Sequence, residues 1–175
     1  MCIRVYIACG LTHVPRCEFS GYVELIEGLA KTLTSRLGAD VKYALRDSDP
    51  QLAQKPSSDR ARLCYLWDKA MVEWADIIVA EASYPSIGLG IELQIACARE
   101  IPILITFKLD DRHKAVPVAY TTPDHKTHSL QLGDGYVSLM ALGLPSIFEV
   151  LPYSDAEQAY TQVEKVVDTL RLNET

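Results

Sequence analysis

The sequence predicts an α/β fold built on a doubly wound, five-stranded parallel sheet with helices on both faces. Two observations predict it. Short apolar runs without polar alternation recur along the 175-residue chain, as expected for strands that are covered on both faces. Between these runs lie longer segments whose apolar residues recur at helical spacing. Such alternation is typical of a parallel sheet, and the length predicts a single domain over residues 1–175.

The strands are expected at five short apolar runs, each bounded by polar residues, glycine or proline. The third run is the most continuous, and it is followed directly by a turn rich in proline, serine and glycine. In chain order the runs are 3–9 (IRVYIAC), 40–45 (DVKYAL), 77–80 (IIVA), 101–107 (IPILITF) and 147–151 (IFEVL).

Four helices are expected between and after these strands. The first covers 22–37 and ends at Gly38, because glycine readily adopts the left-handed conformation of a helix end. The second is capped by Ser57 or Ser58 and runs to about Trp74, the third begins after Ser86, and the last covers 155–172. The second helix is expected to bury a stripe of four residues: Leu63, Trp67, Ala70 and Trp74.

Two segments do not fit a strand or a helix. Residues 47–58 are polar, contain Pro50 and Pro56, and are predicted to form a loop. Residues 108–136 begin with several charges and hold three of the four histidines, and loops of this length in a domain are usually functional or mobile. A helical turn is expected at 137–142.

Composition and charge narrow the classes of partner. The net charge of −6 argues against nucleic acid polymers and anionic membranes as main partners. No apolar run reaches membrane-spanning length, and the N-terminus lacks a signal-peptide pattern, so a cytoplasmic location is expected. The five cysteines include no pair at CxxC spacing, which favours reduced thiols in the cytosol.

The most informative stretch is 76–93, which predicts a buried strand, a turn and a helix. Ser86 is a candidate N-cap, and Gly88 and Gly90 allow a ligand to approach the backbone closely. Small ligands of doubly wound sheets bind at the carboxyl ends of the strands, at turns of this kind. The turn lacks the GK[ST] ending of a Walker loop, and Leu93 replaces the last glycine of a dinucleotide fingerprint.

Glu92 is the first candidate for chemistry. It is expected in or near the first turn of the third helix, where the helix dipole favours the ionised carboxylate. An ionised carboxylate beneath a sugar C1′ stabilises an oxocarbenium-like transition state or attacks it covalently. The alternative is a glutamate that only complements the dipole.

Asp68 and Tyr6 are the second and third candidates. Asp68 has apolar neighbours in the second helix, and a partly buried aspartate near another carboxylate can donate a proton to a departing base. The alternative is a solvated aspartate paired with Lys69 or Arg62. Tyr6 is expected at the same end of the sheet, where its hydroxyl can orient Glu92; the alternative is a core tyrosine.

The residues of 76–93, taken together, resemble the nucleoside 2-deoxyribosyltransferase superfamily, and most closely its 2′-deoxynucleoside 5′-phosphate N-hydrolases. The resemblance covers most of the chain and implies a flavodoxin-like sheet. It gives Glu92 the place of the catalytic glutamate, Asp68 that of the acid, and Tyr6 that of the tyrosine which positions the glutamate. It implies neither a metal nor a cofactor. His125 and His128 are expected to be polar loop residues, because nothing else in the sequence supplies a clear set of metal ligands.

The resemblance also implies how the substrate is held. Ser86 matches a serine that contacts a 5′ phosphate, and Ser138 matches a serine lent by a neighbouring subunit, which implies a homodimer or larger homo-oligomer. The family has glycine three residues after the first-strand tyrosine. Here Cys9 stands at that place and Gly10 follows, so Gly10 is the expected substrate contact, together with Gly88 and Gly90.

The sequence therefore predicts an enzyme that cleaves or exchanges the N-glycosidic bond of a nucleoside or nucleoside 5′-monophosphate. Ser86 and Ser138 favour the hydrolase over the transferase. Two alternatives stay open. One is NAD glycohydrolysis, because TIR-type domains also use a flavodoxin-like sheet and one glutamate. The other is a nucleotide sensor that binds without turnover, because fold alone does not fix function.

Overall fold

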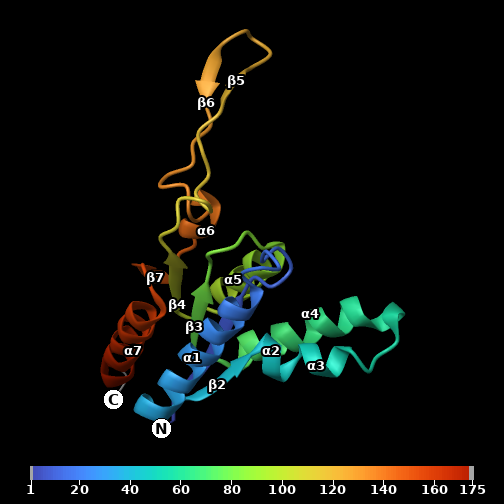
Figure 1. The fold of residues 1–175 in the computed structure, drawn as a ribbon, viewed down its shortest axis with the longest axis vertical. Helices are drawn as coiled ribbons and strands as arrows, with labels where there is room; N and C mark the ends of the chain where they lie inside the picture. The colour runs from blue at the N-terminus through green and yellow to red at the C-terminus, as the bar shows by residue number, and fades with distance from the viewer. Residues whose placement is uncertain (1, 174–175) are drawn as a thin grey trace.

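The computed structural model describes residues 2–173 and is built around a parallel five-stranded sheet (Figure 1). The strand order is β2-β1-β3-β4-β7, and every neighbouring pair is parallel. The predicted doubly wound sheet is thus confirmed. Its strands are β1 (Arg4–Cys9), β2 (Asp40–Tyr43), β3 (Ile77–Glu81), β4 (Ile103–Lys108) and β7 (Ile147–Tyr153).

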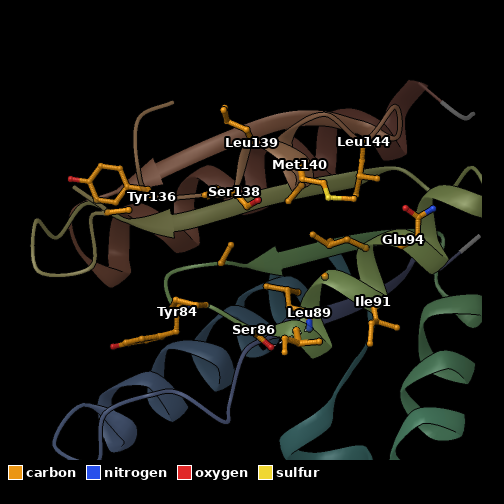
Figure 2. Close-up of a pocket in the computed structure, with 18 of the residues that line it drawn as sticks. Tyr84, Ser86, Leu89, Ile91, Gln94, Tyr136, Ser138, Leu139, Met140 and Leu144 are labelled. Carbon is orange, nitrogen blue, oxygen red and sulfur yellow. Dashed lines mark hydrogen bonds between the residues drawn. The ribbon is translucent and has the colours of Figure 1, made fainter. Parts of the chain in front are cut away.

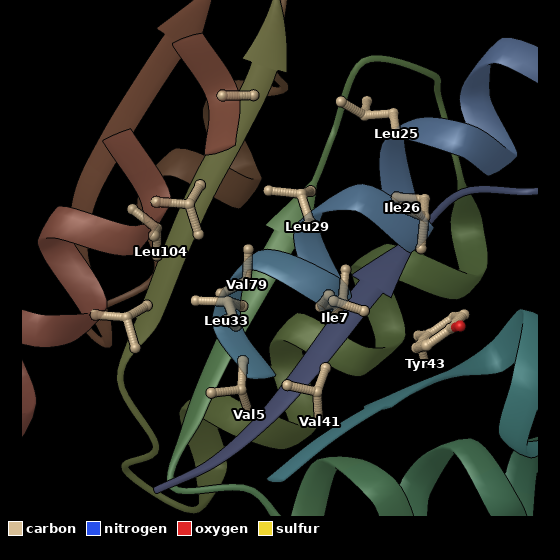
Figure 3. Close-up of a cluster of buried hydrophobic side chains, with 14 of the residues drawn as sticks. Val5, Ile7, Leu25, Ile26, Leu29, Leu33, Val41, Tyr43, Val79 and Leu104 are labelled. Atoms are coloured by element: carbon tan, nitrogen blue, oxygen red, sulfur yellow. The ribbon is translucent and has the colours of Figure 1, made fainter. Parts of the chain in front are cut away.

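Helices cover both faces of the sheet. On one face, α1 (Phe19–Leu37) and α7 (Ala156–Asn173) pack on inward residues of β1, β3 and β4. On the other face lie α4 (Ser57–Trp74) and α5 (Ile87–Ala98), whose buried residues contact the alternate positions of the same strands. Figure 3 shows the first of these interfaces, where four residues of α1 meet the sheet: Leu25, Ile26, Leu29 and Leu33.

Gly38 ends α1 as expected. Its φ of 63° is left-handed, and its N–H donates to the carbonyl of Thr34 at 3.1 Å. The next N–H, of Ala39, donates to Leu33 at 3.3 Å, so two carbonyls at the helix end are satisfied. This tight ending lets the chain turn straight into β2.

The segment between β2 and α4 differs from the prediction. Residues 47–58 are not a continuous loop, because the short helix α2 (Ala44–Asp47) ends in them and a second short helix, α3 (Asp49–Leu52), lies within them. Strand β2 also ends earlier than expected. Neither Ser57 nor Ser58 caps α4: Pro56 stands at the N-cap, without a side-chain hydrogen bond. The buried stripe of α4 is shifted as well. Ala70 is exposed, and the buried residues of α4 are Met71 and Val72.

The long segment after β4 leaves the body of the protein. It forms the antiparallel pair β5 (Ala119–Thr121) and β6 (Thr127–Ser129), which projects far from the sheet in Figure 1. The expected helical turn follows as α6 (Leu139–Leu142). None of the helices within residues 2–173 combines the length and the apolar character needed to cross a bilayer.

Candidate active site

The centre of the site is a buried pair formed by Tyr6 and Glu92. Tyr6 lies on β1 with no exposed surface, on the face of the sheet that α4 and α5 cover. Its hydroxyl donates a hydrogen bond to Glu92 Oε1 at 2.5 Å. The structure therefore joins these two predicted residues, which are 86 positions apart, and Tyr6 orients the carboxyl group as expected.

The electrostatic environment of Glu92 differs from the prediction. The residue is the sixth of α5, whose first turn holds no acidic residue, and its exposed fraction is 8%. Three effects together raise the pKa of Glu92 to about 8: burial raises it most, the hydrogen bond from Tyr6 lowers it, and the negative charge of Asp68 raises it. The expected preference for the ionised form at the helix N-terminus is thus wrong, because loss of hydration dominates.

Asp68 lies close enough to belong to the same site. Its charge raises the pKa of both Glu92 and Tyr6, although the first cause in each case is burial. The half-buried Asp68 is not paired with Lys69, which instead binds Glu73 at 2.7 Å. Its Oδ1 is buried without a hydrogen-bond partner. A buried acceptor without a donor is costly, so this oxygen is available to a ligand group.

Two thiols stand beside the acids and were not expected there. Cys64, one turn before Asp68 on α4, donates from Sγ to Asp68 Oδ2 at 3.3 Å. Burial raises the pKa of Cys64 to about 11 and also raises the pKa of Cys9, at the end of β1. Both thiols therefore stay protonated at neutral pH, which excludes them as thiolate nucleophiles. The i, i+4 spacing of Cys64 and Asp68 is the signal that sequence reasoning could have used.

The turn before α5 has the predicted cap. Ser86 Oγ accepts a hydrogen bond from the N–H of Leu89 at 3.1 Å. Gly10 packs against this turn, since a Cβ at that position would lie 2.7 Å from Ser86 Cβ. Gly88 and Gly90 have no such neighbour: a Cβ would meet only Ser86 Oγ at 3.6 Å in the first case and nothing within 4 Å in the second. Of these three glycines, Gly10 alone is required by close packing.

A second buried carboxylate supports this turn. Glu81 is fully buried at the end of β3, and burial raises its pKa. It accepts hydrogen bonds from the hydroxyl and the N–H of Ser83 and from Tyr153 Oη, the last at 2.7 Å. These bonds tie the chain just before Ser86 to β7. Sequence analysis did not single out Glu81; the signal was a charged residue directly after a continuous apolar strand.

A large cavity of about 1070 Å³ opens on the side of α5 that faces away from the Tyr6–Glu92 pair (Figure 2). Three predicted substrate-binding residues line it: Ser86, Gly90 and Ser138. Two histidines, His13 and His113, line it as well.

The predicted catalytic residues are not part of this lining. At roughly 100° per residue, Glu92 points about 140° around the helix from Ile87, which faces the cavity. The structure therefore brings the two acids and Tyr6 together on the α4 side of α5. It places Ser138 across the cavity, facing Ser86.

No family model matches the sequence. The chain is 29% identical over 125 residues to a Methanosarcina mazei protein named "Putative 2′-deoxynucleoside 5′-phosphate N-hydrolase 1". The matched residues make up 71% of this chain and 61% of that protein. A Syntrophotalea carbinolica protein of the same name is 49% identical over 43 residues, 25% of this chain and 30% of that protein. The chain thus spans about three fifths of the length of the first relative.

Two solved structures share the fold. Clostridium botulinum CMP N-glycosidase, BcmB, superposes with a TM-score of 0.56 over 92% of this chain and 98% of its own, at 16% identity. A conserved protein from Enterococcus faecalis V583 superposes with a TM-score of 0.58 over 94% of this chain and 99% of its own, also at 16% identity. The resemblance drawn from residues 76–93 is thereby confirmed: the chain is similar in sequence to the proteins named as 2′-deoxynucleoside 5′-phosphate N-hydrolases and has the fold of the CMP N-glycosidase.

Proposed function

We propose that this protein hydrolyses the N-glycosidic bond of a nucleoside 5′-monophosphate or nucleoside. The observation that carries the proposal is the buried Tyr6–Glu92 hydrogen bond beside Asp68, whose Oδ1 has no partner. The similarity to proteins named as N-hydrolases supports it. The proposed substrate is a small molecule rather than a nucleic acid polymer or a membrane, and no cofactor takes part.

The two acids share one proton, and in the reacting form Asp68 holds it while Glu92 is ionised. In the first step, Glu92 attacks C1′ of the sugar and forms a bond from its carboxylate oxygen to C1′. The C1′–N bond breaks, its electron pair goes to the base, and Asp68 in its acid form donates a proton to that base. In the second step, Asp68 takes a proton from water while the water oxygen attacks C1′ and releases Glu92. Tyr6 holds the Glu92 carboxyl in place throughout. The products are free base and sugar 5′-phosphate.

The turn at Ser86 is the proposed phosphate contact, because unpaired N–H groups at the start of a twelve-residue helix favour an anion. We further propose that the enzyme works in the cytoplasm as a homo-oligomer and that Ser138 reaches the phosphate held by a neighbouring subunit. The position of Ser138 on an open cavity, exposed to solvent, supports this assignment.

The proposal is tested by incubating a panel of 2′-deoxynucleoside and ribonucleoside 5′-monophosphates, and the matching nucleosides, and measuring free base by chromatography. Glu92→Gln should lower base release at least about a hundredfold. The matched control is Glu27→Gln, an exposed position in the middle of α1, which should leave it unchanged. A folded protein that releases no base from any member of the panel contradicts the proposal.

The same assay separates the alternatives. Transfer to a second base, added in excess, identifies a transferase, because the covalent intermediate is then protected from water. Release of nicotinamide from NAD identifies a glycohydrolase of the TIR type. Nucleotide binding that Glu92→Gln leaves unchanged, without any product, identifies a sensor.

A further inference from the structure

The two oxygens of Asp68 are bonded differently. Oδ2 accepts a hydrogen bond from the thiol of Cys64 at 3.3 Å, whereas Oδ1 is buried and has no partner among residues 2–173. Both residues lie on α4, which packs beside α5 on the face of the sheet that holds the Tyr6–Glu92 pair (Figure 1). In the proposed reaction Asp68 holds the shared proton and gives it to the base. The difference between its oxygens therefore bears on which of them carries that proton.

Helix geometry brings Cys64 to Asp68. Residues four apart lie one above the other on the same side of a helix, and neither glycine nor proline interrupts this turn of α4. Cys64 and Asp68 are both half-buried, whereas Tyr65 and Leu66 between them are exposed. The thiol and the carboxyl group therefore turn toward the protein, and the backbone of an 18-residue helix, rather than a loop, sets the contact between them.

The thiol is the donor in this contact. Sulfur is a weak acceptor, whereas a carboxyl oxygen is a strong one. Burial raises the pKa of Cys64 to about 11, and the charge of Asp68 raises it as well, so the thiol keeps its proton at neutral pH. In a carboxylic acid the carbonyl oxygen accepts hydrogen bonds better than the hydroxyl oxygen does. The acid form of Asp68 is therefore favoured with Oδ2 as the carbonyl oxygen, which accepts from the thiol, and with the proton on Oδ1.

We infer that Cys64 is a positioning residue of the proposed reaction: its thiol occupies Asp68 Oδ2 and so leaves the proton on Oδ1, the oxygen that is free to give it to the departing base. This inference rests on the proposed function. In the first step the proton passes from Oδ1 to the base, which receives the electron pair of the C1′–N bond. In the second step Oδ1 takes a proton from the attacking water. The thiol keeps its own proton throughout, so no oxidant or reductant is needed.

A weak donor suits this place. A lysine or arginine beside Asp68 would stabilise the ionised carboxylate and draw the shared proton away from it. The S–H group is a weak donor, so it fixes one oxygen with less preference for the charged form. The charges that act on Cys64 together with Asp68 come from Glu92 on α5 and Asp49 on α3, and both are acids. The thiol thus orients the carboxyl group within an acidic surrounding without adding a positive charge.

The first experiment compares kcat and KM for base release in three variants of the full chain. Cys64→Ala removes the donor, so that the proton of Asp68 is no longer confined to one oxygen, and kcat should fall about tenfold with KM unchanged. Cys64→Ser keeps a donor at the same place and should restore kcat to within about threefold of the wild type. Cys97→Ala, at a half-buried cysteine of α5, is the matched control and should leave both constants unchanged.

A second substrate separates positioning from support of the fold. It is the ring-methylated form of whichever base the wild type releases, because such a base already carries a positive charge and leaves as a neutral molecule. Its departure needs no proton from Asp68, so Cys64→Ala should cleave it as fast as the wild type does. A cysteine that only supports the fold would slow both substrates alike when it is replaced by alanine. Circular dichroism checks that each variant is folded.

Infrared spectroscopy reads the contact without turnover. The S–H stretching band of Cys64 is identified by its loss in Cys64→Ala, and it should move to higher frequency in Asp68→Ala, which removes the acceptor. A band that Asp68→Ala leaves in place would overturn the inference. So would an active wild type whose kcat is unchanged in Cys64→Ala, or equal slowing of both substrates. A wild type that releases no base at all is a different result, because it shows the failure of the proposed function itself.

Discussion

Glu92 is predicted to destabilise the folded protein at neutral pH, and Glu92→Gln should remove that cost. Burial raises the pKa of Glu92 from its ordinary value of 4.5 to about 8. Below 4.5 the carboxyl is protonated in both the folded and the unfolded chain, so it contributes no pH dependence. Between 4.5 and 8 the unfolded chain ionises freely while the folded one holds its proton, and stability falls as the pH rises.

The size of the effect follows from these two values. At about 1.4 kcal/mol per unit of pH, the interval from 4.5 to about 8 amounts to about 5 kcal/mol at full development. At pH 7 about 3 kcal/mol of it is present. Glutamine has the same shape as protonated glutamate and can accept the hydrogen bond from Tyr6. Glu92→Gln should therefore equal the wild type near pH 4 and exceed it by about 3 kcal/mol at pH 7.

The free energy of unfolding is measured by urea titration at several values of pH from 4 to 9, for the wild type, Glu92→Gln and the exposed control Glu27→Gln. The control should run parallel to the wild type at every pH. Glu92→Gln should diverge from it progressively above pH 4.5. Parallel curves for the wild type and Glu92→Gln between pH 5 and 8 would refute the reasoning, because they would mean that Glu92 ionises as readily in the folded protein as in the unfolded chain.

Four further variants test individual contacts of the site. Tyr6→Phe removes the hydrogen bond that lowers the pKa of Glu92, so the pH midpoint of base release should move above 8; an unchanged midpoint would contradict the contact. Asp68→Asn removes a charge that raises this pKa, so the midpoint should move below 8, while the loss of the proton donor slows base release about a hundredfold or more. Ser86→Ala should cost about 1 kcal/mol in urea titration, since it removes the cap of α5, and should raise KM more for 5′-monophosphates than for nucleosides; equal changes in KM would argue against a phosphate contact. Gly10→Ala should cost about 1–3 kcal/mol by the same titration because its Cβ would meet Ser86, and a neutral substitution would show that the turn is free to move.

The sheet could be predicted from the sequence because its strands are covered on both faces. Continuous apolar runs such as 77–80 have few other interpretations, and Gly38 marks the end of α1. The short helices α2 and α3 were missed because four-residue helices have no apolar period, and Pro50 was interpreted as a loop residue although it stands at the start of α3. The projecting pair β5 and β6 left only a weak signal in the sequence, with apolar residues at 116, 118 and 120.

The residues of the candidate site could be predicted from the sequence, but the raised pKa of Glu92 could not. The residue pattern and the resemblance both pointed to Tyr6, Asp68 and Glu92. The structure joins Tyr6 to Glu92 by a hydrogen bond and places Asp68 near enough to raise the pKa of both. The predicted ionisation of Glu92 was wrong because two effects of opposite sign compete there: the helix dipole favours the charged form and burial disfavours it. A helix dipole contributes about 0.3–1 kcal/mol near an exposed helix end, whereas the raised pKa of this carboxyl, caused first by burial, corresponds to about 5 kcal/mol. Burial depends on what α4 and β1 place around the side chain, and that is not visible in the local sequence.

Helix α5 has an inverted pattern, with its charge inside and its large apolar residues outside. Glu92 faces Tyr6, while Ile87 and Ile91 are exposed on the cavity side. A surface helix that served only the fold would have the reverse arrangement. The inner side of α5 is explained by a reacting carboxyl that must be shielded from water, and the outer side by the apolar lining of the cavity. One helix therefore serves both parts of the proposed site, because the same twelve residues present Glu92 on one side and line the cavity on the other.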